Sequence, residues 1–198
     1  MIRPVLTGLT GLTAAWTLLI AGPAMAQQVV PAQSEIGFVS KQMGVPVEGR
    51  FKQWTAKIAF DPKKAEAASV AFTIQTGSAS FGAAEIDGEV PKAEWFNAAK
   101  FPQASFASSA IKPLGGGRFE LRGKLAIKGA TQDVVVPVTL IQTTGAAGTA
   151  GAASAAVGNF VIKRLDFKIG DGDWADTSMV ASDVTVKFQR ALTGMAPL

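Results

Sequence analysis

The sequence contains no cysteine, no histidine and no tyrosine. Without cysteine the chain can form no disulfide bond, so its fold must be held together by its core. Ser-His-Asp and Cys-His catalysis are excluded, and so are haem ligation by these residues and the usual zinc sites. Only carboxylates could then act as acid and base, and the predicted strands carry no pair of carboxylates on an inner face. We therefore expect that the protein is not an enzyme and that it uses no cofactor.

The acidic segment near the C-terminus is not expected to bind a metal ion. Asp171, Asp173 and Asp176 could suggest calcium, but Ala175 occupies the third ligand position of the EF-hand pattern and Ser182 replaces the closing glutamate. The segment instead predicts a solvated acidic turn.

Charge is modest and scattered along the chain. The 198 residues include 19 Lys and Arg against 15 Asp and Glu, which gives a formal net charge of +4. A nucleic-acid-binding surface would need clustered basic residues with stacking aromatics, so we expect no nucleic-acid partner. The length suits one domain once a targeting segment is removed.

The first 26 residues have the features of a cleavable secretory signal peptide. Arg3 gives a positive start, residues 5–20 are largely apolar, and residues 24–26 (Ala-Met-Ala) fit a cleavage site. The alternative is an uncleaved membrane anchor, although the apolar run is short for a span. We expect an exported mature domain of residues 27–198 that does not span a membrane.

Two long strands joined by a tight turn form the clearest pattern, at residues 118–140. In the first strand apolar residues alternate with charged ones, which is typical of a half-buried antiparallel strand. Residues 128–131 supply the turn. The second strand is apolar on both faces, so one of its faces must pack inward.

The remaining strands follow at hairpin spacing, which predicts a mainly β chain with about eight antiparallel strands. Closure into a barrel would remove exposed edges, and a barrel of eight strands can hold one slender ligand. One or two short helices are expected within residues 77–100, with one beginning at Pro91, and a flexible loop is expected over residues 142–158. The other predicted strands are residues 33–41 with an irregular continuation at 45–51, then 55–60, 69–76, 103–111, 159–163 and 183–190.

Three stretches match the motifs of one known family. Residues 93–106 (AEWFNAAKFPQASF) hold an aromatic pair followed by Phe-Pro. Residues 125–138 (LAIKGATQDVVVPV) fit L-x-I-K/R-G-x-T … V-x-x-P-V, and residues 162–167 (IKRLDF) fit Arg-x-Asp-Phe. With these motifs the chain resembles the YceI-like family of exported bacterial proteins, over about residues 34–190. The resemblance implies a lipocalin-like barrel in the periplasm that holds long apolar molecules, including polyisoprenoids.

One part of the chain departs from the family pattern. Related sequences often carry an Arg-Asp-x-His element ahead of the aromatic pair, whereas residues 84–89 here contain neither Arg nor His. A polar ligand head held in this region would therefore be bound in a different way.

The resemblance implies that inward apolar side chains line a tunnel, whereas their alternation alone favours plain core packing. Trp95 and Phe96 would form the lid or wall of the tunnel mouth, or would cap the barrel end. Arg164 and Asp166 would share a face on a regular strand, so they could pair with each other, or Arg164 could meet an anionic head group. The candidate ligand-binding residues are Phe38, Phe72, Ile74, Trp95, Phe96, Phe106, Leu121, Leu125, Val136, Phe160, Ile162, Val186 and Phe188.

Two roles remain open from the sequence. In the first, the protein carries, stores or sequesters a polyisoprenoid, an isoprenoid quinone or a fatty amide. In the second, it docks on a membrane cytochrome or an envelope complex through residues 171–180, a segment that resembles relatives found beside b-type cytochromes. Any lipid would then be structural, and the exposed face of residues 135–141 could add a contact patch. A homodimer is compatible with either role.

Overall fold

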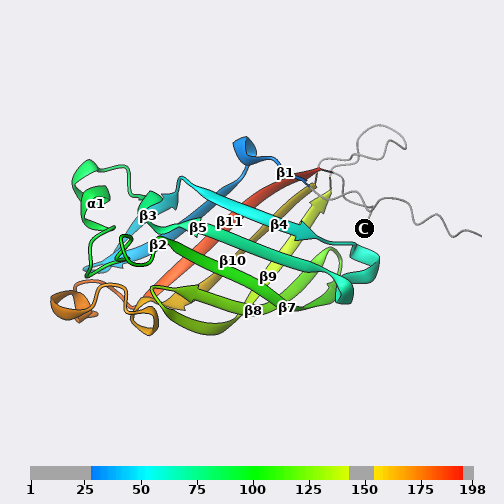
Figure 1. Cartoon of the computed structure of the whole chain (residues 1–198). Coiled ribbons are helices and arrows are strands. Elements are labelled where there is room, and N and C mark those ends of the chain that lie inside the picture. The colour runs from blue at the N-terminus through cyan, green and yellow to red at the C-terminus, as the bar shows by residue number, and fades with distance from the viewer. Residues whose placement is uncertain (1–27, 143–153, 194–198) are drawn as a thin grey trace, which may run out of the picture.

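The computed structural model describes residues 28–142 and 154–193. The predicted signal peptide and most of the predicted Ala- and Gly-rich loop lie outside these residues. One antiparallel sheet makes up the described chain, with few helices (Figure 1). Its strands are β1 Gln28–Val29, β2 Glu35–Gln42, β3 Val45–Phe51, β4 Trp54–Ala59, β5 Ser69–Gln75, β6 Ala79–Ser80, β7 Gln103–Gly115, β8 Arg118–Ile127, β9 Ala130–Gln142, β10 Ser154–Lys163 and β11 Asp183–Thr193.

The sheet follows the order β4-β5-β7-β8-β9-β10-β11-β2-β3-β6, and β1 pairs with β11. The predicted mainly β, antiparallel class is confirmed, but the predicted number of eight strands is too low for the 11-stranded sheet of the described residues. Two of the missed strands, β1 and β6, are only two residues long, too short to show a period of two.

The sheet curls into a barrel-like shape around its apolar face (Figure 1). Arg190 of β11 stacks on Trp54 of β4, although β5, β7, β8, β9 and β10 separate these strands in the sheet. The contact therefore joins two distant parts of the curl from the inside. In the described residues the end strands β4 and β6 form no ladder with each other, and only the residues before them are joined, by hydrogen bonds of Lys52 and Gln53 with Ser78.

The predicted central hairpin is confirmed as β8 and β9. Ile127 lies opposite Ala130, and the turn residues Lys128 and Gly129 have φ values of 47° and 78°, as a tight hairpin turn requires. The inner face is buried, as the alternation predicted. On the outer face of β9, Val135 and Ile141 are about half exposed, at 51% and 49%.

Two predicted segments differ from the structure. The helix expected from Pro91 is wrong: α1 spans Ala84–Glu89, and residues 91–99 form turns. The loop expected to extend to Gly158 is also too long at its end, because β10 already begins at Ser154. The small residues of this strand are paired on both sides, with β9 and β11. Five short 3-10 helices complete the described chain: η1 Pro31–Gln33, η2 Pro62–Ala67, η3 Thr76–Ser78, η4 Arg164–Phe167 and η5 Gly172–Ala175.

Glycines in the strands make room for inward phenylalanine rings. Gly158 lies opposite Phe188 in the ladder, and a Cβ on Gly158 would come within 2.6 Å of the Phe188 ring. A Cβ on Gly123 would lie 2.7 Å from the ring of Phe106. Because real Cβ atoms do not approach other atoms so closely, the rings can occupy these positions only over glycine.

We expect that Gly158→Ala lowers the free energy of unfolding by about 1–3 kcal/mol, because the new methyl group must displace the partly buried ring of Phe188 or the carbonyl group of Pro137. Gly88→Ala is the control, since a Cβ on this residue of α1 meets nothing within 4 Å. Alanine favours a helix, so this variant should keep or slightly raise stability. Urea unfolding of both variants measures the difference, and an equal stability of the two would contradict the steric role of Gly158.

Candidate ligand-binding cavity

An elongated apolar cavity of about 490 Å³ runs inside the curled sheet. This volume falls within the range of about 300–1,000 Å³ that is usual for small-molecule sites. All thirteen residues that were predicted from the sequence as ligand-binding line it together. Their part in binding stays a prediction, but the structure brings them to one space rather than to a fully packed core.

The sequence reasoning missed several lining residues. Phe60 lines the cavity and follows Ile58 by two positions, so the alternation of its strand could have identified it. Arg190 also lines the cavity, two residues after Phe188 on the same face of β11. The period of two carries this signal, but the expectation of apolar inner residues excluded an arginine.

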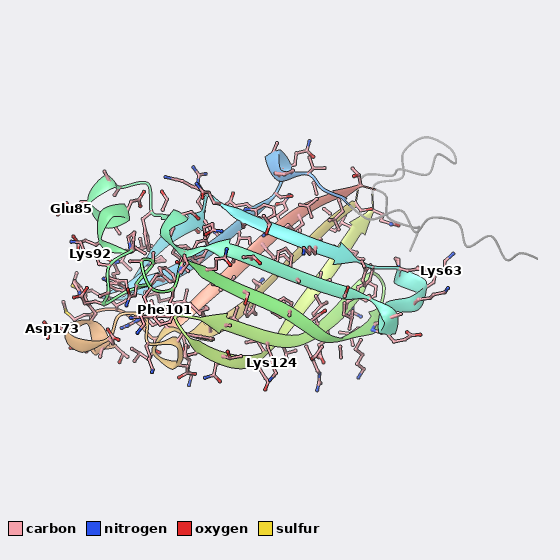
Figure 2. All side chains as sticks on the ribbon, viewed as in Figure 1. Lys63, Glu85, Lys92, Phe101, Lys124 and Asp173 are labelled. Atoms are coloured by element: carbon pink, nitrogen blue, oxygen red, sulfur yellow. The ribbon has the colours of Figure 1, made fainter. Side chains whose placement is uncertain are left out.

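One end of the cavity opens between loops and forms a mouth. Met43, Trp174 and Met179 line the cavity there and are 74%, 43% and 47% exposed. Helix α1 and the segment from η4 to η5 lie at this same end (Figure 1). Glu85 and Asp173 project at this end of the molecule, whereas Lys63 lies at the opposite end (Figure 2). The mouth therefore combines exposed apolar side chains with acidic ones.

Arg164 organises the loops of the mouth. It is only 2% exposed, and its guanidinium donates five hydrogen bonds to backbone carbonyls at 2.6–3.1 Å. Burial lowers the pKa of this side chain. The accepting carbonyls belong to Ala181, Ile169, Gly170, Trp174 and Val180. Since a guanidinium has five N–H donors, none is left for a ligand.

The predicted pairing of Arg164 with Asp166 is therefore wrong, and so is the predicted head-group contact of Arg164. Asp166 is exposed, and no ion pair joins it to Arg164 among the described residues. The prediction assumed a regular strand, in which residues two apart share a face. Both residues instead lie in η4, where side chains two apart diverge.

Lys128 fixes the mouth from the hairpin turn between β8 and β9. Its Nζ lies 2.6 Å from the carbonyl oxygen of Lys168, 3.2 Å from that of Glu94 and 3.4 Å from Oδ2 of Asp171. Its side chain is 6% exposed. The loop that carries Trp95 and the loop that carries Trp174 are thus tied to the same buried cation, and the two indole rings lie 5.4 Å apart.

Asp87 fastens α1 beside the mouth. Its carboxylate accepts hydrogen bonds of 2.6 Å from the hydroxyl of Ser80 and from the amide of Phe81, and Nζ of Lys52 lies 3.7 Å away. The Ser80 hydrogen bond, and after it the Phe81 amide, lowers the pKa of Asp87 below its usual value of 3.8. This residue lies in the segment where the sequence departs from the family pattern.

Arg190 is the second buried cation of the cavity and is 1% exposed. Its Nη1 donates to the carbonyl oxygens of Glu35 and Gln189. The guanidinium lies over the rings of Trp54 and Phe72, with its carbon 4.0 Å and 5.3 Å from their centroids. Burial lowers the pKa of Arg190 to about 10, so the side chain stays charged at neutral pH.

Comparisons with known proteins agree with this architecture. The model of the YceI-like domain family matches residues 27–192. The chain belongs to the YceI-like family. A UPF0312 protein of Pseudomonas savastanoi pv. phaseolicola is 31% identical over 136 residues, which cover 66% of this chain and 71% of the relative.

Solved structures are similar to this YceI-like chain along most of its length. The crystal structure of Burkholderia cenocepacia BcnA is 41% identical, with a TM-score of 0.77, and the match covers 83% of this chain and 99% of BcnA. A polyisoprenoid binding domain from Saccharophagus degradans has a TM-score of 0.66 at 15% identity, covering 85% and 98% of the two chains, and shows the shared fold alone. No helix in the described part of the YceI-like chain is both long and apolar enough to cross a membrane.

We expect that Arg164→Lys lowers the free energy of unfolding by more than about 2 kcal/mol, because an ammonium cannot serve five separate carbonyls and leaves buried ones without a donor. Asp166→Asn should change it by less than about 0.5 kcal/mol, as an exposed residue outside any ion pair would. Thermal and urea unfolding measure both. An equal loss of unfolding free energy in the two variants would instead support a salt bridge between Arg164 and Asp166.

Asp87 should make the stability of the protein sensitive to acid. A carboxylate whose pKa is lowered by folding stabilises the folded state above its unfolded pKa, near 3.8, and loses this effect as pH falls through the folded value. Asp87→Asn should therefore be less stable than the wild type at pH 7, and the two should converge below pH 3.8. A difference that stays constant from pH 7 to pH 2 would rule out this linkage.

Proposed function

We propose that the protein is an exported binding protein that holds one long apolar ligand inside a lipocalin-like barrel. The ligand class is a polyisoprenoid, an isoprenoid quinone or a fatty amide, and the role is transport, storage or sequestration in the periplasm. The observation that carries the proposal is the continuous apolar cavity of about 490 Å³ with a mouth at one end. Export would depend on the predicted signal peptide, which is removed by cleavage after Ala26.

The size of the hydrophobic effect favours a long ligand over a short one. Burial contributes about 0.8 kcal/mol per methylene group, whereas association costs about 4–15 kcal/mol before any net affinity remains. A ligand of a few carbons would not be retained on this balance. Roughly twenty buried methylenes supply about 16 kcal/mol, which exceeds this range of costs.

Family membership and fold add support. The Saccharophagus degradans domain that shares the fold is described as polyisoprenoid binding. No chemical step is needed for the proposed role. At the mouth, Arg164 binds the carbonyl of Trp174, and Lys128 binds the carbonyl of Glu94, next to Trp95. Because these bonds hold both tryptophans in place, the proposal assigns them to the entrance of the cavity.

Native mass spectrometry of the protein purified from its exported form tests the proposal. The expected result is a stoichiometric prenyl or acyl compound that organic extraction releases, with a mass that separates quinone, polyprenol and amide. A protein that is empty and also refuses added isoprenoids would contradict the proposal and favour the docking role of residues 171–180.

A pair of neighbouring valines offers a matched test of where the ligand lies. Val136 is 5% exposed and lines the cavity, whereas Val135 is 51% exposed on the outer face. Val136→Phe should fill part of the cavity and weaken the binding of a long-chain probe by tenfold or more. Val135→Phe should leave affinity within about twofold. Fluorescence titration with a polyene fatty acid measures both, and an equal loss would mean that the probe binds outside the cavity.

A further inference from the structure

Two buried arginines line the cavity, but their hydrogen bonding differs. Arg164 uses all five of its N–H groups on backbone carbonyls. Arg190 uses only the two on Nη1. Its Nε and Nη2 are buried and have no acceptor in the part of the chain that the structure describes. Arg190 is thus a cation with three N–H groups that lack an acceptor.

The surroundings of Arg190 do not compensate for these three N–H groups. Trp54 and Phe72 contact the guanidinium through their rings, which attract its charge but offer no oxygen or nitrogen acceptor to its N–H groups. Among the described residues no carboxylate lies within 4.0 Å of Arg190, although the charge of Glu35 partly opposes the effect of burial on its pKa. Since buried N–H groups are almost always paired, an acceptor is expected to arrive from outside the chain.

The place of Arg190 in the fold indicates what brings that acceptor. Arg190 follows Val184, Val186 and Phe188 on the inner face of β11, and these residues line the cavity with it. Arg190 lies seven positions after Asp183, which is at the mouth end of the strand, so the two are about 23 Å apart along the strand at 3.3 Å per residue. A group that reaches Arg190 must therefore lie deep within an apolar space, as the polar end of an apolar ligand would.

The atoms that lack an acceptor also define the shape of the group. Nε and Nη2 lie on one edge of the guanidinium, and this edge presents two parallel N–H bonds. Such an edge matches the two oxygens of a carboxylate or a phosphate in a bidentate contact. A single carbonyl or hydroxyl oxygen would satisfy only part of it.

We infer that Arg190 is the head-group anchor of the cavity: it binds the paired oxygens of an anionic head, carboxylate or phosphate, on a long-chain ligand whose tail extends toward the mouth at Trp174. This inference rests on the proposed function and refines it, because it names the chemistry of the head. It also gives the bound ligand a direction, with the head inward and the tail toward the loops.

The first test follows the Nε–Hε resonance of Arg190 by NMR in the wild-type mature protein stripped of lipid. Palmitate, hexadecyl phosphate, hexadecanol and hexadecylamine serve as probes with one chain length. Palmitate or the phosphate should shift the resonance and bind at least tenfold more tightly than hexadecanol or hexadecylamine. The difference between palmitate and hexadecyl phosphate assigns the head as carboxylate or phosphate. Arg190→Lys assigns the signal.

Variants separate anchoring from structural support. Arg190→Gln should bind hexadecanol within about threefold of the wild type but lose the preference for palmitate. Trp54→Leu removes the stacking ring and keeps the N–H groups, so it should keep the preference even where its thermal stability falls. If Arg190→Gln does not fold, the wild-type resonance still decides the question.

The outcomes distinguish the two levels of the proposal. If the probes bind with equal affinity and the Arg190 resonance does not move, Arg190 only supports the fold, and the anchor is overturned while the binding function stands. If no long-chain probe binds at all, the proposed function fails and the anchor fails with it.

Discussion

A single β-sheet has one apolar face to bury, and the described chain provides no second sheet or helical layer to cover that face. The sheet buries its apolar face by curling until the inner side chains face one another. Phe60, just after β4, meets Phe119 of β8 edge to face with ring centroids 5.0 Å apart, and the ring of Phe38 lies 5.2 Å from those of Phe51 and Phe81. With no cysteine in the chain, this inward packing must supply most of the stability.

The curl also explains why the interior is not full. A barrel-like sheet has an inner width set by its strands, and side chains from opposite walls fill it only where they are large enough. The phenylalanines that lie over Gly49, Gly123 and Gly158 are held close to the wall, which leaves the axis open. The aromatic-over-glycine arrangement thus contributes to the open interior. A substitution that disturbs the wall should then affect stability and binding together.

The sequence predicted this structure well where the chain forms regular strands, and poorly where it leaves them. The period of two identified the inner face of β8 and eleven of the thirteen candidate lining residues, because long strands impose that period whatever the loops do. Trp95 and Phe96 lie in turns, and only the family motif indicated them. It failed for Arg164 and Asp166 because the chain leaves the strand at Lys163 and enters η4. It also failed for β10 before Asn159, where alanine and glycine look like a loop in sequence but serve close packing in the sheet. A short helix within residues 77–100 was predicted, but its position was wrong because α1 lacks a side-chain cap that would mark its start and is held by the tertiary bonds of Asp87.

Arg164 and Arg190 show how residue type and burial can be the same while the roles differ. At 2% and 1% exposure the two side chains are equally withdrawn from water, and both line the cavity. Arg164 meets five carbonyls that irregular loops would otherwise leave without donors, so its charge is consumed in building the mouth. Arg190 lies on β11 inside the sheet, where most backbone carbonyls already accept hydrogen bonds from the amides of neighbouring strands, so few acceptors remain for its side chain. A guanidinium placed among paired strands keeps part of its bonding capacity, and in a cavity that capacity is available to a ligand.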